Sequence, residues 1–342
     1  MRFRIAGHLA STGILLALSS LLPADPARAV DGVIEIGQVC ALNTGCGEGD
    51  LPGFPVSLTK PGSYRLVSHL ELPDRDWTAI LVGAHDVTID LNGFSIRPRE
   101  DCRPDCGAPG LGSGILAPQM ENLAVRNGTL LGLGHEGIRS GDYAQISDVR
   151  IFGTGSTGLV TGSHSEIRDT TVSTTGGYGI EAGLDVAILD SVVRAAANEG
   201  IRAAGIPLIS RTRIHNNGQM GIRIDGLGGA VIGNVVAGNG DLGIRAQDAV
   251  FADNMLSQNQ LGLYFLGGDA SVVRGNAFSN SPLVDVASTK NSLVVDNAIH
   301  GIINAGSETG TNGNVLGDNG SSSISGGAAI APNVCDGALG CP

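Results

Sequence analysis

The feature that most constrains this chain is an internal repeat of about 21 residues. A glycine followed by isoleucine or leucine recurs with spacings of 23, 21, 21, 21, 21, 22 and 19 residues, at Gly114, Gly137, Gly158, Gly179, Gly200, Gly221, Gly243 and Gly262. A second pattern, apolar-x-x-polar-x-apolar, keeps the same period from Ile146 to Ile299. Because two patterns stay in phase over eight units, the chain is interpreted as a repeat protein.

The residues inside each repeat predict short β-strands. Apolar residues alternate at period two, β-branched residues predominate among them, and no 3.6-residue period persists. The unit is too short for a propeller blade or a helix pair, and the Leu-x-x-Leu-x-Leu pattern of leucine-rich repeats is absent. We therefore predict an all-β fold, a right-handed parallel β-helix (solenoid) of about ten coils, in which each coil lies about 4.8 Å from the next.

Asparagine recurs at two turn positions of the repeat. One column holds Asn234, Asn254, Asn276 and Asn297, and another holds Asn217, Asn239 and Asn259. Asparagine tolerates left-handed turn conformations, and stacked amide side chains can hydrogen-bond along a column. We interpret both columns as structural.

The repeat also sets the expected domain organisation. The β-helix is predicted to span residues 64–303, and residues 97–112 are expected to form a loop outside one coil. Residues 30–63 are expected to form a small N-terminal cap, because an open end of the solenoid exposes strand edges. Residues 304–342 are expected to form a C-terminal cap or flexible tail.

Residues 1–29 have the features of a secretory signal peptide. Two arginines precede a short apolar run, and Ala27-Arg28-Ala29 is a small-x-small cleavage site. The run is too short to span a bilayer, and no later segment is apolar enough over a sufficient length. We expect a secreted or periplasmic protein whose mature chain starts near Val30 and contains no membrane span.

The six cysteines form three close pairs, and an even number in an exported chain indicates disulfides. The pairs are Cys40/Cys46, Cys102/Cys106 and Cys335/Cys341. Each would close a loop of only a few residues and so stabilise a local turn or cap. A zinc site is the less favoured interpretation, because no pair has histidine nearby in ligand spacing.

The charge balance bears on possible partners. The formal net charge is −12, and removal of residues 1–29, with three arginines and one aspartate, makes it −14. Nucleic acid is therefore not an expected partner, since binding it requires a basic surface. No cofactor and no metal site are assigned from the sequence, and the oligomeric state stays open.

By its Gly-Ile strand starts and its asparagine columns, the chain resembles the pectin-lyase-like superfamily of right-handed parallel β-helices over roughly residues 64–303. That resemblance implies a fold but no single function, since members include pectate and alginate lyases, polygalacturonases, mannuronan epimerases and proteins without known activity. The polygalacturonase motifs Asn-Thr-Asp, Asp-Asp, Gly-His-Gly and Arg-Ile-Lys and the epimerase motif Asp-Pro-His-Glu are absent. Gly134-His135-Glu136 comes nearest, and no catalytic residue is assigned.

One column of outward-facing residues is the candidate binding site. The residue after each Gly-Ile pair faces outward, which gives Arg139, Val160, Glu181, Arg202, Arg223, Arg245 and Tyr264 in successive coils. Three consecutive arginines about 5 Å apart repel one another, and arginine forks match carboxylates. The predicted glycan-binding surface is Arg202, Arg223, Asp225, Arg245 and Tyr264. The alternative is a solvated strand face on which Asp225 and Glu181 partly neutralise the arginines.

The remaining candidates are acids and histidines. Asp148, Asp169 and Asp190, 21 residues apart, could hold calcium, although routine turn positions are the favoured interpretation. The histidines share no column and are interpreted as solvated turn residues; they are His135, His164, His215 and His300. Glu136 and Glu199, which each precede a Gly-Ile pair, are also interpreted as solvated.

These features lead to three hypotheses about function. The first is a non-catalytic, exported β-helix that binds polysaccharide, with acidic polysaccharide as the candidate partner, or acts at the cell surface. The second is a polysaccharide lyase or epimerase acting on acidic glycans, with its site on the arginine column. The third is a purely structural or adhesive stalk. The missing motifs favour the first hypothesis over the second, and the arginine column favours either over the third.

Overall fold

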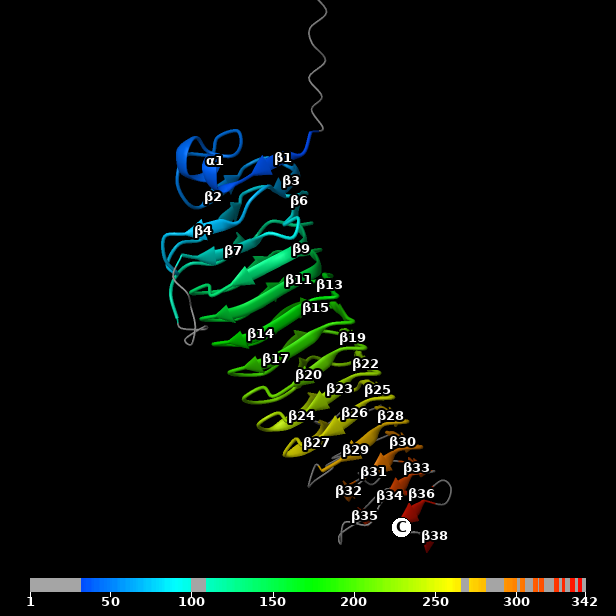
Figure 1. Ribbon diagram of the computed structural model, residues 1–342. Coiled ribbons are helices and arrows are strands. Elements are labelled where there is room, and N and C mark those ends of the chain that lie inside the picture. Colours follow the sequence, from blue (N-terminus) through cyan, green and yellow to red (C-terminus); the bar gives the residue numbers. More distant parts are fainter. Residues whose placement is uncertain are drawn as a thin grey trace, which may run out of the picture. The chain divides into compact units, whose positions relative to one another are not determined.

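The described chain is nearly all β-structure, and its strands are stacked in parallel along the chain (Figure 1). The computed structural model describes residues 32–99, 109–265, 271–280, 292–299, 302–304, 310–312, 314–316, 323–325, 328–329, 333–335 and 338–339. The predicted signal peptide lies outside these residues, as do Cys102, Cys106, Cys341, His300 and the side chain of Cys335. The strands make about 11 turns, close to the ten predicted.

One side of each coil belongs to a ten-stranded parallel sheet that contains the Gly-Ile strands. Its strands are β2 (Val56–Leu58), β5 (Ile80–Val82), β8 (Ile115–Ala117), β10 (Ile138–Ser140), β12 (Leu159–Thr161), β15 (Ile180–Leu184), β18 (Ile201–Ala204), β21 (Ile222–Asp225), β24 (Leu242–Ala246) and β27 (Leu261–Phe265). Neighbours in this sheet are separated by one repeat in sequence, which confirms the parallel solenoid.

The other strands form a 26-stranded sheet with two parallel ladders, which the long strands β9 (Ala124–Leu131) and β11 (Gln145–Thr154) join. The first ladder also contains β1 (Ile34–Ile36), β3 (Gly62–Leu66), β6 (Val87–Asp90), β13 (Glu166–Arg168), β16 (Ala187–Leu189), β19 (Leu208–Ser210), β22 (Ala230–Ile232), β25 (Val250–Ala252), β28 (Val272–Arg274), β30 (Leu293–Val295), β33 (Gly310–Asn312) and β36 (Ala328–Ala329). The second contains β4 (Leu70–Leu72), β7 (Ser95–Pro98), β14 (Thr171–Thr175), β17 (Val192–Ala196), β20 (Arg213–His215), β23 (Val235–Ala237), β26 (Met255–Ser257), β29 (Ala277–Ser279), β31 (Ala298–Ile299), β34 (Val315–Leu316) and β37 (Val334–Cys335).

The ladders reach beyond residues 64–303 at both ends. β1 pairs in parallel with β3, and β34 pairs in parallel with β37. β37 then pairs with β38 (Ala338–Leu339) in antiparallel fashion, and β32 (Ile302–Asn304) pairs with β35 (Ser323–Ser325). The helix α1 (Gln38–Asn43) follows β1, and Cys40 is bonded to Cys46, as predicted. In the described part of the chain, no helix has the length and apolar character needed to cross a membrane.

The repeated Gly-Ile pair reflects the packing of the core. Ile180, Ile201, Ile222 and Ile244 are completely buried and stack one above another, as predicted. A Cβ atom on Gly179 would lie 2.3 Å from Cγ1 of Val193 and 2.5 Å from the carbonyl oxygen of Gly200. The chain passes too close to its neighbours here for any side chain, so glycine recurs at this position in the coils from Gly114 to Gly262.

The asparagines form the predicted hydrogen-bonded ladder. Nδ2 of Asn254 donates to Oδ1 of Asn276 at 2.9 Å and to the carbonyl oxygen of Val231 at 2.8 Å, while its Oδ1 accepts from the amide and side chain of Asn234. The side chain is 2 % exposed. The column continues through Asn297 into Asn314 and Asn333. Buried amides thus find their partners in the next coil, as they must.

Candidate functional site

The structure places the predicted arginine column in register on the ten-stranded sheet. Arg202 pairs with Arg223, Arg223 with Arg245, and Arg245 with Tyr264 as Cα partners in successive coils. The column continues through Glu181 and Val160 to Arg139. The inward neighbours are the buried isoleucines, so these side chains project from the outer face of the sheet.

Asp225 lies between two of the arginines and binds both. Nε of Arg202 donates to Oδ2 of Asp225 at 3.0 Å, and Nε of Arg223 donates to Oδ1 at 2.8 Å. The mutual repulsion expected from the sequence is therefore partly relieved within the chain, in line with the alternative interpretation given above.

Further groups fix the same two guanidinium groups. Nη1 of Arg202 donates to the hydroxyl of Tyr178 at 3.2 Å and lies 3.5 Å from Glu181, and its guanidinium carbon lies 5.5 Å from the centre of the Tyr178 ring. Nη1 of Arg223 donates to Glu199 at 3.4 Å. Neither Nη2 makes a hydrogen bond to the described residues, so each fork is held in place with donors left over.

The pKa values of this network follow from its contacts. Partial burial alone would raise the pKa of Asp225, but hydrogen bonds from Arg223 and Arg202 outweigh it and lower that pKa below its ordinary value. The bond to Asp225 is also the main reason that the pKa of each arginine is raised. The ionised pairs are therefore stable at neutral pH.

Arg245 and Tyr264 differ from the two paired arginines. Arg245 is partly buried, and among the residues that the structure describes it has no ion-pair partner. Tyr264 stacks one coil further along the same column and is also partly exposed. A shallow hollow of about 160 Å³ lies beside Arg202 and Asp225. The predicted residues are thus brought together on one face of the sheet.

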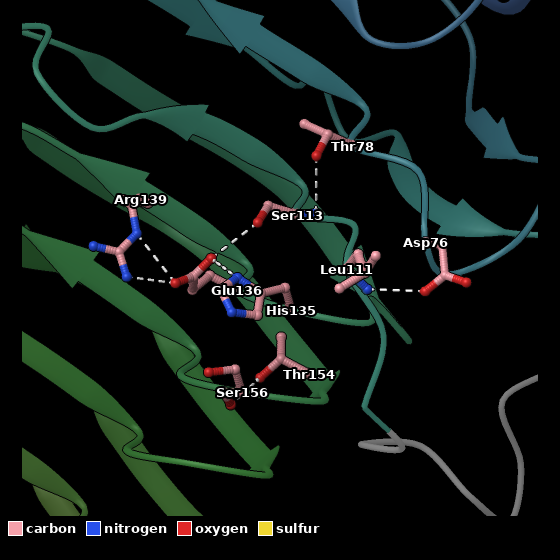
Figure 2. A network of polar contacts seen from close by, with 9 residues as sticks. All are labelled: Asp76, Thr78, Leu111, Ser113, His135, Glu136, Arg139, Thr154 and Ser156. Carbon is pink, nitrogen blue, oxygen red and sulfur yellow. Dashed lines mark hydrogen bonds and ion pairs between the residues drawn. The ribbon is translucent and has the colours of Figure 1, made fainter.

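The interpretation of Glu136 and Glu199 as solvated is wrong. Their exposed fractions are 2 % and 3 %. Figure 2 shows Glu136 at the centre of a polar network, in which it accepts from the hydroxyl of Ser113 at 2.9 Å and from Nε of Arg139 at 3.1 Å. Both glutamates are therefore buried, and an arginine lies beside each: Arg139 beside Glu136 and Arg223 beside Glu199.

Glu136 also fixes the orientation of His135. Burial pushes the pKa of Glu136 upward, but the hydrogen bonds from Arg139 and Ser113 and the nearby charges lower it overall. Nδ1 of His135 contacts the carboxylate, which can only accept, so Nδ1 carries the proton (Figure 2). The ring is about half exposed, with a side-chain exposed fraction of 47 %. A buried carboxylate that orients an exposed imidazole can support proton transfer at Nε2.

The aspartate column forms turns, as predicted. Asp148, Asp169 and Asp190 have φ values of 54°, 49° and 50°, in the left-handed region that aspartate tolerates. Asp190 accepts from Nε of Arg211 at 2.7 Å, and this hydrogen bond lowers its pKa. Within the described ranges, no three His, Cys, Asp or Glu side chains cluster closely enough to hold a metal ion.

Sequence reasoning missed a groove with a volume of about 810 Å³ at the turn that precedes the first ladder. Tyr143 and His164 lie in it with their rings stacked, with centroids 5.2 Å apart and planes 15° from parallel. The interpretation of His164 as a solvated turn residue is correct for its backbone, with φ at 57°, but it missed the stacking. Aligning the repeats would have revealed the signal, because Asn122, Tyr143, His164 and Asp185 share one turn position.

The similarity of this chain to known proteins lies in its fold. No protein-family model matches the chain, and no curated protein matches it. Among solved structures, the A-module of the mannuronan C-5 epimerase AlgE4 of Azotobacter vinelandii is similar with a TM-score of 0.52 and 12% identity, over 89% of this chain and 87% of that one. DFA-IIIase of Arthrobacter chlorophenolicus A6 without its lid gives a TM-score of 0.49 and 13% identity, over 79% of this chain and 90% of that one. The chain therefore has the right-handed parallel β-helix fold of the AlgE4 A-module.

Proposed function

We propose that this chain is an exported, non-catalytic β-helix protein that binds an acidic polysaccharide along the column Arg202, Arg223, Arg245 and Tyr264. The observation that carries the proposal is the register of this column, which places arginines on three consecutive strands of one outer face. Carboxylates that recur along a glycan then meet guanidinium groups that recur along the solenoid. The similarity to a module named for mannuronan, a polymer of uronic acid, supports the same class of ligand.

The contacts within the column determine how strong this binding is. Asp225 already occupies one edge of Arg202 and Arg223, so a carboxylate of the glycan reaches their Nη2 donors and the side chain of Arg245, which has no ion-pair partner within the described residues. Exposed charge contacts of this kind are weak and are screened by salt. The hollow on this face has a volume of only about 160 Å³, so it encloses little of a glycan. We therefore expect low affinity that falls as ionic strength rises.

The test is calorimetric titration of the mature protein with oligomannuronate at two salt concentrations. Arg245→Ser removes an arginine that has no partner in the described chain, and we expect it to weaken binding about tenfold, as loss of one charged hydrogen bond does. Asp225→Asn frees two guanidinium groups and should strengthen binding. Arg126→Ser, which changes an exposed arginine on another sheet, is the matched control and should change nothing.

Two results would contradict the proposal. Oligomannuronate binding that survives Arg245→Ser and ignores Asp225→Asn would place the site elsewhere, and absence of any binding by the parent would favour a structural stalk. The triple serine substitution of all three arginines is a poor test. Without Arg223, the nearly buried Glu199 loses its ion pair, so the triple variant is expected to be destabilised rather than merely unable to bind.

A second candidate function, a lyase or epimerase acting on acidic glycans, is favoured by one observation. His135 is oriented by the buried Glu136 and keeps a half-exposed ring, as a proton-transfer group does. It lies about three coils from Arg202, or roughly 14 Å along the solenoid. The oligomannuronate recovered after titration also tests this candidate. A lyase would leave new unsaturated ends on it, and an epimerase would alter the stereochemistry of its sugars. If the parent protein made such products and His135→Gln did not, an enzymatic function would replace the binding proposal.

A further inference from the structure

The groove at Tyr143 is a built surface that the arginine column does not use. It lies across the coils of β6, β9, β11 and β13, whereas the column runs through β18, β21, β24 and β27. Its volume of about 810 Å³ is in the range of sites for small molecules. The groove is lined chiefly by Asp86, Glu121, Glu166, Gln145, Tyr143 and His164.

The backbone at this groove carries residues that do not suit it. Five stacked turn residues have φ values between 57° and 59°, namely Asp86, Asn122, Tyr143, His164 and Asp185. Aspartate and asparagine tolerate this left-handed conformation, whereas a bulky tyrosine does so at a cost. Tyr143 gains little burial in return, because 52 % of it remains exposed. Neither turn geometry nor core packing accounts for an aromatic ring at this position.

The rings and the acids together define the chemistry that the groove can accept. Tyr143 and His164 stack face to face, so each ring covers one face of the other, and about half of each side chain stays exposed. Around the two rings, the carboxylates of Asp86, Glu121 and Glu166 are hydrogen-bond acceptors, and the side-chain amide of Gln145 has no partner among the described residues. Such a site matches a ring with apolar faces and hydroxyl groups on its edge.

We infer that the Tyr143 groove binds an uncharged sugar of a glycan, with a pyranose packed on the face of the Tyr143 ring that His164 does not cover and hydroxyl groups donating to the surrounding carboxylates. Glu166 lies 3.6 Å from Nε of Arg168, whereas Asp86 and Glu121 have no ion-pair partner among the described residues and repel a uronic acid, so the ligand differs from the one proposed for the arginine column. The groove is independent of that proposal, since it shares no residue with the column.

The test uses the mature protein and a panel of neutral hexasaccharides: cellohexaose, laminarihexaose, mannohexaose and xylohexaose. Calorimetry should show binding of at least one of them, unchanged by added salt. Tyr143→Ala should weaken it about tenfold or more, the equivalent of one stacking contact, while Tyr143→Phe keeps the ring and stays within about twofold. Trp77→Ala, which removes another exposed aromatic ring outside the groove, is the matched control and should not change binding.

Stability separates a binding role from a structural one. Tyr143→Asn installs a residue that suits the left-handed turn, so the melting temperature should stay the same or rise while binding is lost. A fall in melting temperature for Tyr143→Asn would show that the ring is structural and would overturn the inference. So would the failure of all four hexasaccharides to bind, binding unaffected by Tyr143→Ala, or binding only of the cationic hexamer of glucosamine. Binding of neutral hexasaccharides at the Tyr143 groove should be the same in Arg245→Ser as in the parent, whether or not that variant loses oligomannuronate binding.

Discussion

The buried carboxylates that precede Gly-Ile pairs are each paired with an arginine of the same coil or of the next one. Glu199 precedes a Gly-Ile pair in the same way as Glu136, and each has an arginine beside it, Arg223 for Glu199 and Arg139 for Glu136. The sequence alone does not reveal the burial of these two glutamates or their pairing with arginine, because both depend on how the chain turns before the Gly-Ile pair. Two carboxylates that looked solvated are therefore among the most tightly held groups of the molecule.

Glu136 predicts a pH dependence of stability. Its folded-state pKa is lowered, so its contribution is fully present above its unfolded pKa of about 4.3 and is lost as pH falls through the lower folded value. Glu136→Gln should cost about 1–3 kcal/mol at pH 7 and flatten the loss of stability below about pH 4. Urea unfolding of both proteins from pH 7 to pH 3 measures this difference.

Glu48→Gln serves as the control for that comparison, because 81% of the Glu48 side chain is exposed. It should leave both the stability at pH 7 and its slope with pH nearly unchanged. If Glu136→Gln behaved in the same way, the carboxylate would not be the buried, charged group described here.

At the scale of the element, the coil is held by close approach of backbones and by buried amides. Gly200 is the clearest case: a Cβ there would lie 2.5 Å from Nδ2 of Asn217, 2.6 Å from Cγ2 of Ile214 and 2.8 Å from the carbonyl oxygen of Gly221. One glycine thus lets the isoleucine stack and the asparagine ladder form side by side.

Gly200→Ala is expected to destabilise the protein by about 1–3 kcal/mol, since a methyl group must displace packed neighbours. Gly47→Ala is the matched control, because a Cβ there meets nothing within 4 Å. It should leave the free energy of unfolding unchanged within about 0.5 kcal/mol. Equal melting temperatures for both variants would mean that the coils can separate more easily than the structure indicates.

The strands and turns differ in how well the sequence repeat predicts them. Strand type, register and the buried face of Ile201 followed from the 21-residue period, because stacking repeats the same environment in each coil. The continuation of the ladder to Asn314 and Asn333 did not follow, since the spacing there falls to 17 and 19 residues. The Tyr143 groove was missed because its surface combines turn residues of several coils, and each looks ordinary by itself.

At the scale of the whole molecule, the described chain is built from contacts between neighbouring coils. Each coil adds strands to the same ladders, so stability accumulates along the chain and different faces can carry different chemistry. The arginine column and the Tyr143 groove lie on different strands and differ in charge. A protein with an overall charge of −12 can therefore offer an acidic glycan one favourable surface and a neutral glycan another.

Residues 1–29 and the cysteines bear on the cellular location of the protein. We propose that it is exported, because residues 1–29 have a charged start, a short apolar run and a small-x-small site, and because Cys40 and Cys46 are placed for a disulfide. Mass spectrometry of protein recovered from the periplasm or medium should show a chain that starts near Val30. The same spectra, with and without reduction, should show that all six cysteines are oxidised, including those outside the described residues. Protein made without residues 2–29 is the control and should stay in the cytosol with reduced cysteines, since that compartment keeps thiols reduced. An intact N-terminus and six free thiols in the protein made from the full sequence would refute export. A glycan outside the cell could then not be its ligand.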